Sequence, residues 1–141
     1  MGFRLKVTSS EEISLNEKQI EEMEYKILTP EDSNARSTDL GTEIKVRGKI
    51  IPSIASAEGE PSIGLHRWSL VPAERLDSYR KAELSVVNAG VIVRKITIPN
   101  AFVVEYDEDF SDTTGNGIFF LHIRQKKDKI TGVAIEGGYS E

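Results

Sequence analysis

Residues 91–127 constrain the fold more than any other stretch, because two long runs of alternating polarity follow one another there. Successive side chains of a strand point to opposite faces, so alternation over this length predicts a half-buried pair of strands. The predicted apolar face holds Phe102, Val104, Tyr106 and Phe110 on the first arm and Phe119, Leu121 and Ile123 on the second. Gly115–Asn116 or Asn116–Gly117 would supply the positive-φ residues of the hairpin turn between them.

Charged side chains occupy the other face of both arms of this hairpin. They are Glu105, Asp107 and Asp109 on the first arm and His122, Arg124 and Lys126 on the second. Either turn position keeps the two groups on a common face, where an opposite-charge cross-strand pair is worth about 0.2–1 kcal/mol. A slip of one residue would turn the charges toward the apolar face, so the pattern fixes the register.

Shorter alternating runs predict further strands in the rest of the chain. These runs cover residues 3–7, 23–28, 43–50, 81–88, 91–98 and 132–136. In the clearest of them, one face would hold Ile44, Val46 and Ile50. Residues 9–16 are predicted to be a turn or loop, and residues 137–141 a tail. Ala89–Gly90 is expected to turn the chain, and Pro99 marks an edge, a bulge or a bend because proline cannot donate a ladder hydrogen bond.

One helix is predicted near residues 64–79. Its apolar stripe would consist of Leu65, Trp68, Leu76 and Tyr79. Pro72 is tolerated only in a first turn or at a break, so the helix is expected to be kinked or split there. Trp68 is the single tryptophan, and we interpret it as a core anchor between helix and sheet rather than as a ligand-stacking ring.

Strands that follow one another through turns favour antiparallel pairing, which a barrel or a sandwich usually satisfies. The predicted fold class is therefore mainly β (α+β): an antiparallel β-barrel or sandwich of about seven or eight strands with one helix. At 141 residues the chain is long enough to bury a core, and residues 1–141 are predicted to form a single β-barrel domain.

Charge and hydropathy exclude two classes of partner. The net charge of -5 argues against nucleic acid binding, which usually needs a basic surface. No apolar run approaches the roughly 20 residues of a membrane span.

Residues 1–6 lack an apolar core, so no signal peptide is predicted and synthesis is expected to be cytoplasmic. Any export would then need a dedicated machine. Cysteine is absent, which excludes disulfide and thiolate chemistry.

No catalytic constellation is recognisable. His66 and His122 are the only histidines, and the usual protease, hydrolase and phosphate-loop motifs are missing. The acids that could form a cation site or an acid/base pair are Glu105, Asp107, Glu108, Asp109 and Asp112. Strand alternation spreads these acids over both faces, which favours a structural role. We therefore predict no enzymatic activity, no catalytic residue, no cofactor and no metal site.

Two loops and two charged regions are the candidate contact surfaces. Residues 29–39 and 53–62 have loop composition, and long connections are often functional. Residues 11–32 are strongly acidic and are interpreted as a solvated face. Basic residues cluster at Arg124, Lys126, Lys127 and Lys129. Separate acidic and basic surfaces suit a protein that aligns copies of itself, and equally an ordinary soluble protein with patchy charge.

The order of elements over residues 42–127 resembles the Hcp protein of type VI secretion and the tail tube proteins of contractile phages and injection systems. The most telling piece runs from the strand at residues 80–86 into the long strand at residues 96–104. The resemblance implies a β-barrel protomer with one helix. It also implies a hexameric ring that stacks into a tube, other tube or sheath components as partners, and ring-to-ring contacts through the loops at residues 29–39 and 53–62.

Three functions follow from these observations, in decreasing order of support. The first is a non-enzymatic, self-assembling tube subunit, assembled into an injection apparatus or exported by it. The alternative is a stand-alone β-barrel adaptor or binding module that contacts partners through its loops, and a pocket lined by Trp68, Tyr79 and Tyr106 would favour it. The third is a hydrolase, which would need His66 or His122 within hydrogen-bond reach of a serine or a carboxylate.

Overall fold

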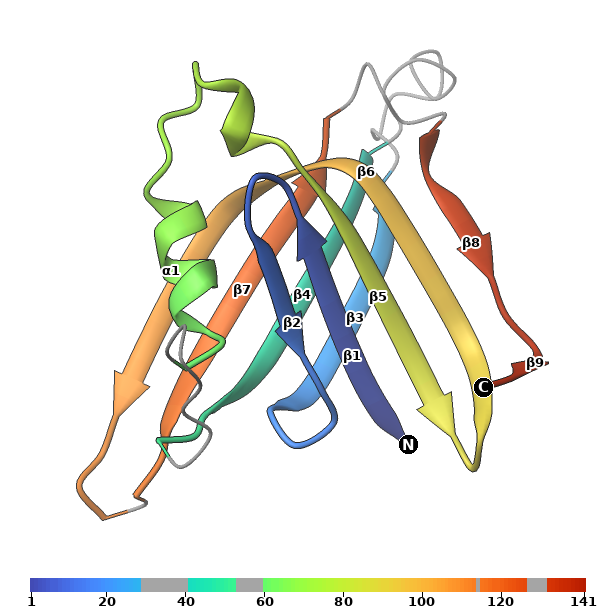
Figure 1. The fold of residues 1–141 in the computed structure, drawn as a ribbon, viewed down its shortest axis with the longest axis horizontal. Helices are drawn as coiled ribbons and strands as arrows, with labels where there is room; N and C mark the ends of the chain where they lie inside the picture. Colours follow the sequence, from blue (N-terminus) through green and yellow to red (C-terminus); the bar gives the residue numbers. More distant parts are fainter. Residues whose placement is uncertain (29–40, 53–59, 114, 127–131) are drawn as a thin grey trace.

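The computed structural model describes residues 1–28, 41–52, 60–113, 115–126 and 132–141. Its strands are β1 (Gly2–Thr8), β2 (Glu12–Leu15), β3 (Ile20–Leu28), β4 (Gly41–Ile50), β5 (Arg80–Asn88), β6 (Val91–Phe110), β7 (Gly117–Gln125), β8 (Ala134–Glu136) and β9 (Tyr139–Ser140). The helices are α1 (Ile63–Ser69) and the short 3-10 helix η2 (Leu76–Ser78). The predicted fold class, mainly β with one α-helix, is confirmed (Figure 1).

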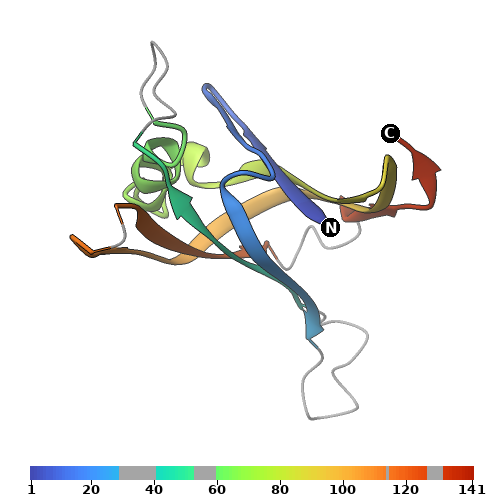
Figure 2. The same cartoon turned by 90° about the horizontal axis from the view of Figure 1, so that it is seen from below.

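All strands of this part of the chain belong to one antiparallel sheet. Its order is β2-β1-β5-β6-β7-β4-β3, with β8 and β9 paired to the first half of β6. The end strands β2 and β3 do not pair with each other, so hydrogen bonds do not close the sheet into the barrel that was predicted. The sheet curls instead, with α1 at one end and the C-terminal strands at the other (Figure 2).

A single apolar core fills the inside of the curl. It consists mainly of Leu5, Val7, Ile44, Val46, Leu65, Trp68, Leu84, Ile98, Phe119, Leu121 and Ile123, each at most 1% exposed. The predicted inward faces of β4 and β7 are therefore confirmed, and so is Trp68 as a core anchor. Gly48 of β4 lets the Phe119 ring reach this core, because a Cβ there would lie 2.6 Å from the ring and 2.4 Å from the carbonyl oxygen of Gln19.

The apolar face predicted for β6 is only partly correct, because each of two bulges changes the parity of the residues after it. Tyr106 packs against the core as predicted, but Val104 does not. One bulge lies at Pro99–Asn100, where two residues of β6 stand between the partners of Arg80 and Ala82. The other lies at Val104, between the partners of Ile123 and His122. Each extra residue turns the following side chains to the opposite face. Ala101 is consequently buried and Val104 is 44% exposed. Phe110 shares the parity of Tyr106 but is the last residue of β6, and it is 66% exposed.

Of the two hairpin turns predicted from the sequence, one is present as predicted and the other is longer. Ala89 and Gly90 have φ values of 51° and 78°, as a two-residue hairpin between Asn88 and Val91 requires. This turn was predicted correctly. The other predicted turn, at Gly115–Asn116 or Asn116–Gly117, is too short, because β6 ends at Phe110 and pairs there with Gly117 of β7. Gly115 has a positive φ of 73°, as was expected of a residue in this turn. The connection is longer and spans residues 111–116.

Three further boundaries differ from the prediction. Residues 12–15 form β2 rather than a loop, and residues 139–140 of the predicted tail form β9. The helix ends at Ser69, three residues before Pro72, and the chain resumes as η2. Leu76 is consequently 91% exposed and lies outside the apolar stripe that was predicted for it.

Candidate functional site

His122, one of the two candidate catalytic residues, lies in a buried ion-pair cluster on β7. Its Nε2 is 2.7 Å from Oε2 of Glu43 on β4, and Nε of Arg124 donates to the same oxygen at 3.2 Å. His122 and Glu43 are 8% and 5% exposed. Burial alone would raise the pKa of Glu43, but the hydrogen bonds from His122 and Arg124 lower it below its usual value. The cluster ties β4 to β7.

The acids of β6 do not supply this partner. Glu105 stands opposite His122, as the hairpin prediction required, but Asp107 faces Phe120 and Asp109 faces Ile118. The carboxylate that pairs with the basic residues of β7 comes from β4, which sequence spacing within the hairpin could not reveal. The neighbouring Asp107 carboxylate, which accepts a hydrogen bond from the protonated form of Glu105 and repels its charged form, raises the pKa of Glu105.

His66, the other candidate, lies at the surface of α1. Its Nδ1 is 2.9 Å from Oε1 of Glu108, and its ring lies 5.8 Å from the ring of Tyr106. Each histidine therefore has a carboxylate within hydrogen-bond reach. Among the described residues, the hydrogen-bond partner of each imidazole is a carboxylate and not a serine hydroxyl. A carboxylate can orient an imidazole, but acyl transfer also needs a nucleophile beside it.

The acids predicted as a possible cation site stay dispersed. Glu108 turns to His66, while Glu105, Asp107 and Asp109 lie exposed on β6. Within the described residues, no group of three or more histidine, aspartate or glutamate side chains is arranged to hold a metal ion. None of the helices in those residues is long and apolar enough to cross a membrane.

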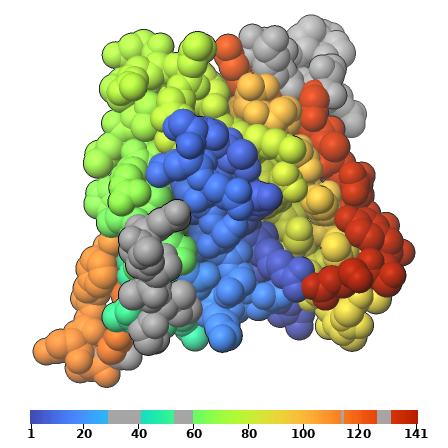
Figure 3. Space-filling view, viewed as in Figure 1, coloured from blue at the N-terminus to red at the C-terminus, as the bar shows by residue number. Residues whose placement is uncertain are grey.

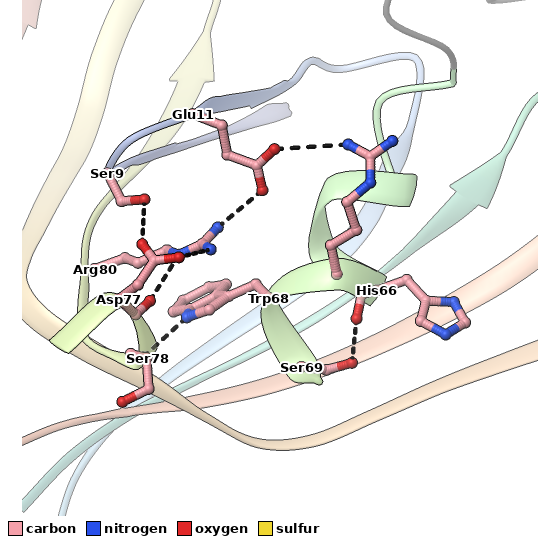
Figure 4. A network of polar contacts seen from close by, with 9 residues as sticks. Ser9, Glu11, His66, Trp68, Ser69, Asp77, Ser78 and Arg80 are labelled. Carbon is pink, nitrogen blue, oxygen red and sulfur yellow. Dashed lines mark hydrogen bonds and ion pairs between the residues drawn. The ribbon is translucent and has the colours of Figure 1, made fainter. Parts of the chain in front are cut away.

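Arg80 is the centre of a second polar network, which sequence analysis missed (Figure 4). Its side chain is 2% exposed. The guanidinium donates to the carboxylates of Glu11 at 3.2 Å and Asp77 at 3.0 Å, and to the main-chain oxygen of Asp77 at 3.0 Å. Ser9 donates to Asp77 at 2.7 Å, and this bond, followed by the charge of Arg80, lowers the pKa of Asp77.

Trp68 connects the same network to the helix. Its indole N–H donates to the main-chain oxygen of Ser78 at 2.9 Å, and the Arg80 guanidinium lies 5.6 Å from its ring. The network therefore joins four segments: the β1–β2 connection, α1, η2 and β5 (Figure 4). Its members stand up to 69 positions apart in the chain, so no local pattern could predict it. It holds the helical layer on the sheet.

The pocket that would have favoured an adaptor is not assembled. Trp68 and Tyr79 line a hollow of only about 70 Å³ together with Phe102. Tyr106 lies elsewhere and stacks on Phe119 at 6.4 Å. A more open hollow of about 700 Å³ lies between the edge strand β2 and α1, where Glu11, Glu12, Glu60 and Arg67 contribute the charge.

Exposed apolar side chains gather at two opposite sides of the molecule. Beside α1, the exposed side chains of Ile63 and Phe110 line one shallow hollow. Along the β5–β6 turn and the C-terminal strands that pair with it, Val91, Ile135 and Tyr139 are exposed. Figures 1 and 3 show these two sides at opposite ends of the same view. The predicted contact loop at residues 29–39 lies outside the described residues, and so does most of the one at 53–62.

The whole fold is similar to solved structures of injection-system proteins. Hcp1 from Flavobacterium johnsoniae matches with a TM-score of 0.58, 16% identity and coverage of 100% of both chains. Hcp1 from the E. coli EAEC 042 pathovar gives 0.59, 10% identity and coverage of 98% of this chain and 99% of that one. A chain of the sheath–tube complex of the extracellular contractile injection system PVC gives 0.53, 14% identity and coverage of 97% and 89%.

This chain has the Hcp fold. The likeness runs through the whole of each Hcp1 chain and not only through residues 42–127, so the predicted resemblance is confirmed at the level of fold. No protein-family model matches the sequence, and no curated protein sequence matches it either. Sequence identities of 10–16% explain why: the fold depends on alternation and burial, which many sequences satisfy.

Proposed function

We propose that this chain is the repeating subunit of the tube of a contractile injection apparatus, of the type VI secretion or phage-tail-like kind. The observation that carries the proposal is the likeness of the fold to Hcp1 over 100% of both chains. The function is mechanical: subunits close a hexameric ring, and rings stack into a hollow tube.

The distribution of exposed features supports head-to-tail closure. Exposed apolar side chains lie at two different places, Ile63 and Phe110 beside α1 and Ile135 and Tyr139 on the C-terminal strands. Figure 1 shows α1 and these strands at opposite ends of the view. Contacts between unlike patches generate a ring when the rotation closes. Burying free strand edges in a ring also removes the aggregation hazard that they present.

The proposal includes no catalytic step. His122 is paired with the carboxylate of Glu43, and His66 with that of Glu108. The other acids of β6 are dispersed, and no group of three acids or histidines among the described residues is arranged to hold a metal ion. The partners would be further copies of the chain and other tube or sheath components. Synthesis would take place in the cytoplasm, followed by assembly into the apparatus or export by it. Because the pocket expected of an adaptor is not formed, we propose no second function.

Size-exclusion chromatography with light scattering over a range of concentrations tests the proposal. A species with six times the 15.7 kDa mass of the chain, forming as concentration rises, is expected. The variant Phe110→Asp, which places a charge in the α1-side patch, should shift the equilibrium toward monomer while its circular dichroism stays unchanged. A strict monomer at millimolar concentration would contradict the proposal.

A further inference from the structure

The first half of β6 carries a strand edge that the chain covers with its own C-terminus. β5 pairs along one side of β6, and β7 pairs along the other side only from Ala101 onward. Before that point the free side of β6 is taken by residues 134–141, which we call the C-terminal strap. β9 pairs with Val91 and Ile92, and β8 with Lys95 to Thr97.

The strap is weakly attached. Every residue from 134 to 141 is exposed, including Ile135 at 53% and Tyr139 at 38%. It is held by short ladders and by two main-chain bonds, from Gly138 to Ile92 at 2.9 Å and from Glu141 to Gly90 at 2.8 Å. Figure 3 shows it as a separate ridge along one margin of the molecule. Segments with few buried apolar contacts open at low free energy.

Charge indicates what the uncovered edge would accept. From Val91 to Ile98, β6 carries Arg94 and Lys95 and no acid. The strap carries Glu136 and Glu141 and no base, and Glu136 stands directly opposite Lys95. Glu141 also pairs with Arg4 of β1. The strap therefore brings acidic side chains to an edge whose own charged side chains are basic, one of which, Lys95, also pairs with Glu83 of β5 at 3.4 Å.

A second acidic strand of suitable length lies at the free end of the sheet. β3 (Ile20–Leu28) has nine residues and contains Glu21, Glu22 and Glu24 against one base, Lys26. Among the described residues no strand is paired with its outer side, although Phe3 of β1 lines a shallow hollow with Glu22 and Met23. The other free edge, β2, borders a hollow whose charge comes from Glu11, Glu12, Glu60 and a single Arg67. β3 would meet like charge at β2 but opposite charge at the first half of β6.

We infer that the C-terminal strap is a removable guard, and that the edge it covers on β6 accepts β3 of a neighbouring copy by strand addition. This inference rests on the proposed function, since it names the seam of the proposed ring and the contact that delays closure. Main-chain hydrogen bonds supply affinity in such strand addition, and side-chain charge selects the partner. When an intramolecular strap covers the edge, the apparent affinity equals the intrinsic affinity multiplied by the fraction of molecules in which the strap is open.

A peptide with the sequence of residues 20–28 tests the edge without requiring a ring. Gly137→Val opens the strap, because a Cβ at this position would lie 2.3 Å from the carbonyl oxygen of Val93. If the strap is open in about a tenth of the molecules, this variant should bind the peptide about tenfold more tightly than the unmodified chain. The same peptide carrying Glu21→Lys, Glu22→Lys and Glu24→Lys is the charge control and should not bind.

A disulfide provides the opposite perturbation. Thr97 and Ala134 are ladder partners, and the chain has no cysteine, so Thr97→Cys with Ala134→Cys gives one defined crosslink. The oxidised protein should neither bind the peptide nor form rings, and reduction should restore both. Peptide binding unaffected by oxidation overturns the inference, and so does equal binding of the control peptide.

The two proposals fail in distinguishable ways. Strap-controlled peptide binding by a protein that never forms rings refutes the tube function and leaves the accepting edge established. Rings that form equally well with the strap locked refute the guard and leave the tube function in place. A covalent dimer on oxidation would show that straps exchange between copies, which also refutes an intramolecular guard.

Discussion

Replacing Arg80 with methionine tests how the helical layer is held on the sheet. The substitution keeps an unbranched side chain over Trp68 but removes the guanidinium. That group makes three hydrogen bonds, two to Asp77 and one to Glu11, from a position 2% exposed. The variant leaves the two carboxylates facing each other without a cation between them.

The expected loss in the free energy of unfolding depends on how deeply each partner of the ion pairs is buried. Removing one partner of a fully buried pair costs about 3–5 kcal/mol. Here the carboxylates of Glu11 and Asp77 are each 35% exposed and regain water. The methionine also retains part of the packing on the indole. We therefore expect the free energy of unfolding to fall by about 2–3 kcal/mol, below the fully buried range.

Urea unfolding at pH 7, followed by circular dichroism, measures this loss. The protein is kept dilute, because self-association would add its own stabilisation. The midpoint should fall with an unchanged slope. Arg80→Lys is the matched control. Its urea midpoint should lie between those of the parent and of Arg80→Met, since an ammonium restores the charge but not the forked geometry of the guanidinium. A loss below about 0.5 kcal/mol in Arg80→Met, the range of ordinary surface substitutions, would refute the account of this network.

Three further predictions concern packing, pH and assembly. Gly48→Ala should destabilise the fold by about 1–3 kcal/mol because its Cβ would overlap the Phe119 ring, whereas Gly41→Ala in the same strand meets nothing closer than 3.7 Å and should change little; equal urea midpoints would contradict this. The folded-state pKa of Glu43 lies below its ordinary 4.5, so its stabilisation is present above that value and is lost as pH falls through the folded pKa. Unfolding of the parent between pH 6 and 3 should therefore depend on pH more steeply than that of Glu43→Gln, and parallel curves would refute the role of the cluster. Phe110→Ser removes a phenyl group that is 66% exposed, so it should weaken assembly of the hexameric ring while changing the monomer's urea midpoint little. Unchanged assembly would exclude this face from the contact between neighbouring subunits.

Where a strand meets regular partners, its sequence pattern predicted its structure. β4 and β7 pair with each other without interruption, so period-2 alternation predicted their inward residues correctly. β6 has the same kind of pattern, but its two bulges cannot be seen in the alternation itself, and the face of Val104 was consequently wrong. Pro99 was the available signal, and it marks the first bulge.

Contacts between distant segments account for most of what sequence analysis missed. Glu43 pairs with His122 across 79 positions, and Glu11 with Arg80 across 69. The hairpin pattern alone assigned the partners of His122 to β6, since β4 had no visible relation to it. β2 and β9 are two to four residues long, shorter than a periodic pattern needs for detection.

Electron microscopy of the purified protein tests the central claim most directly. Negatively stained particles of the Gly137→Val variant at high concentration should be rings with a central opening and sixfold symmetry, stacking into short tubes. The oxidised Thr97→Cys, Ala134→Cys protein provides the comparison. Only small, featureless monomers in the variant, the parent and the reduced protein alike would contradict the claim that this chain builds a tube.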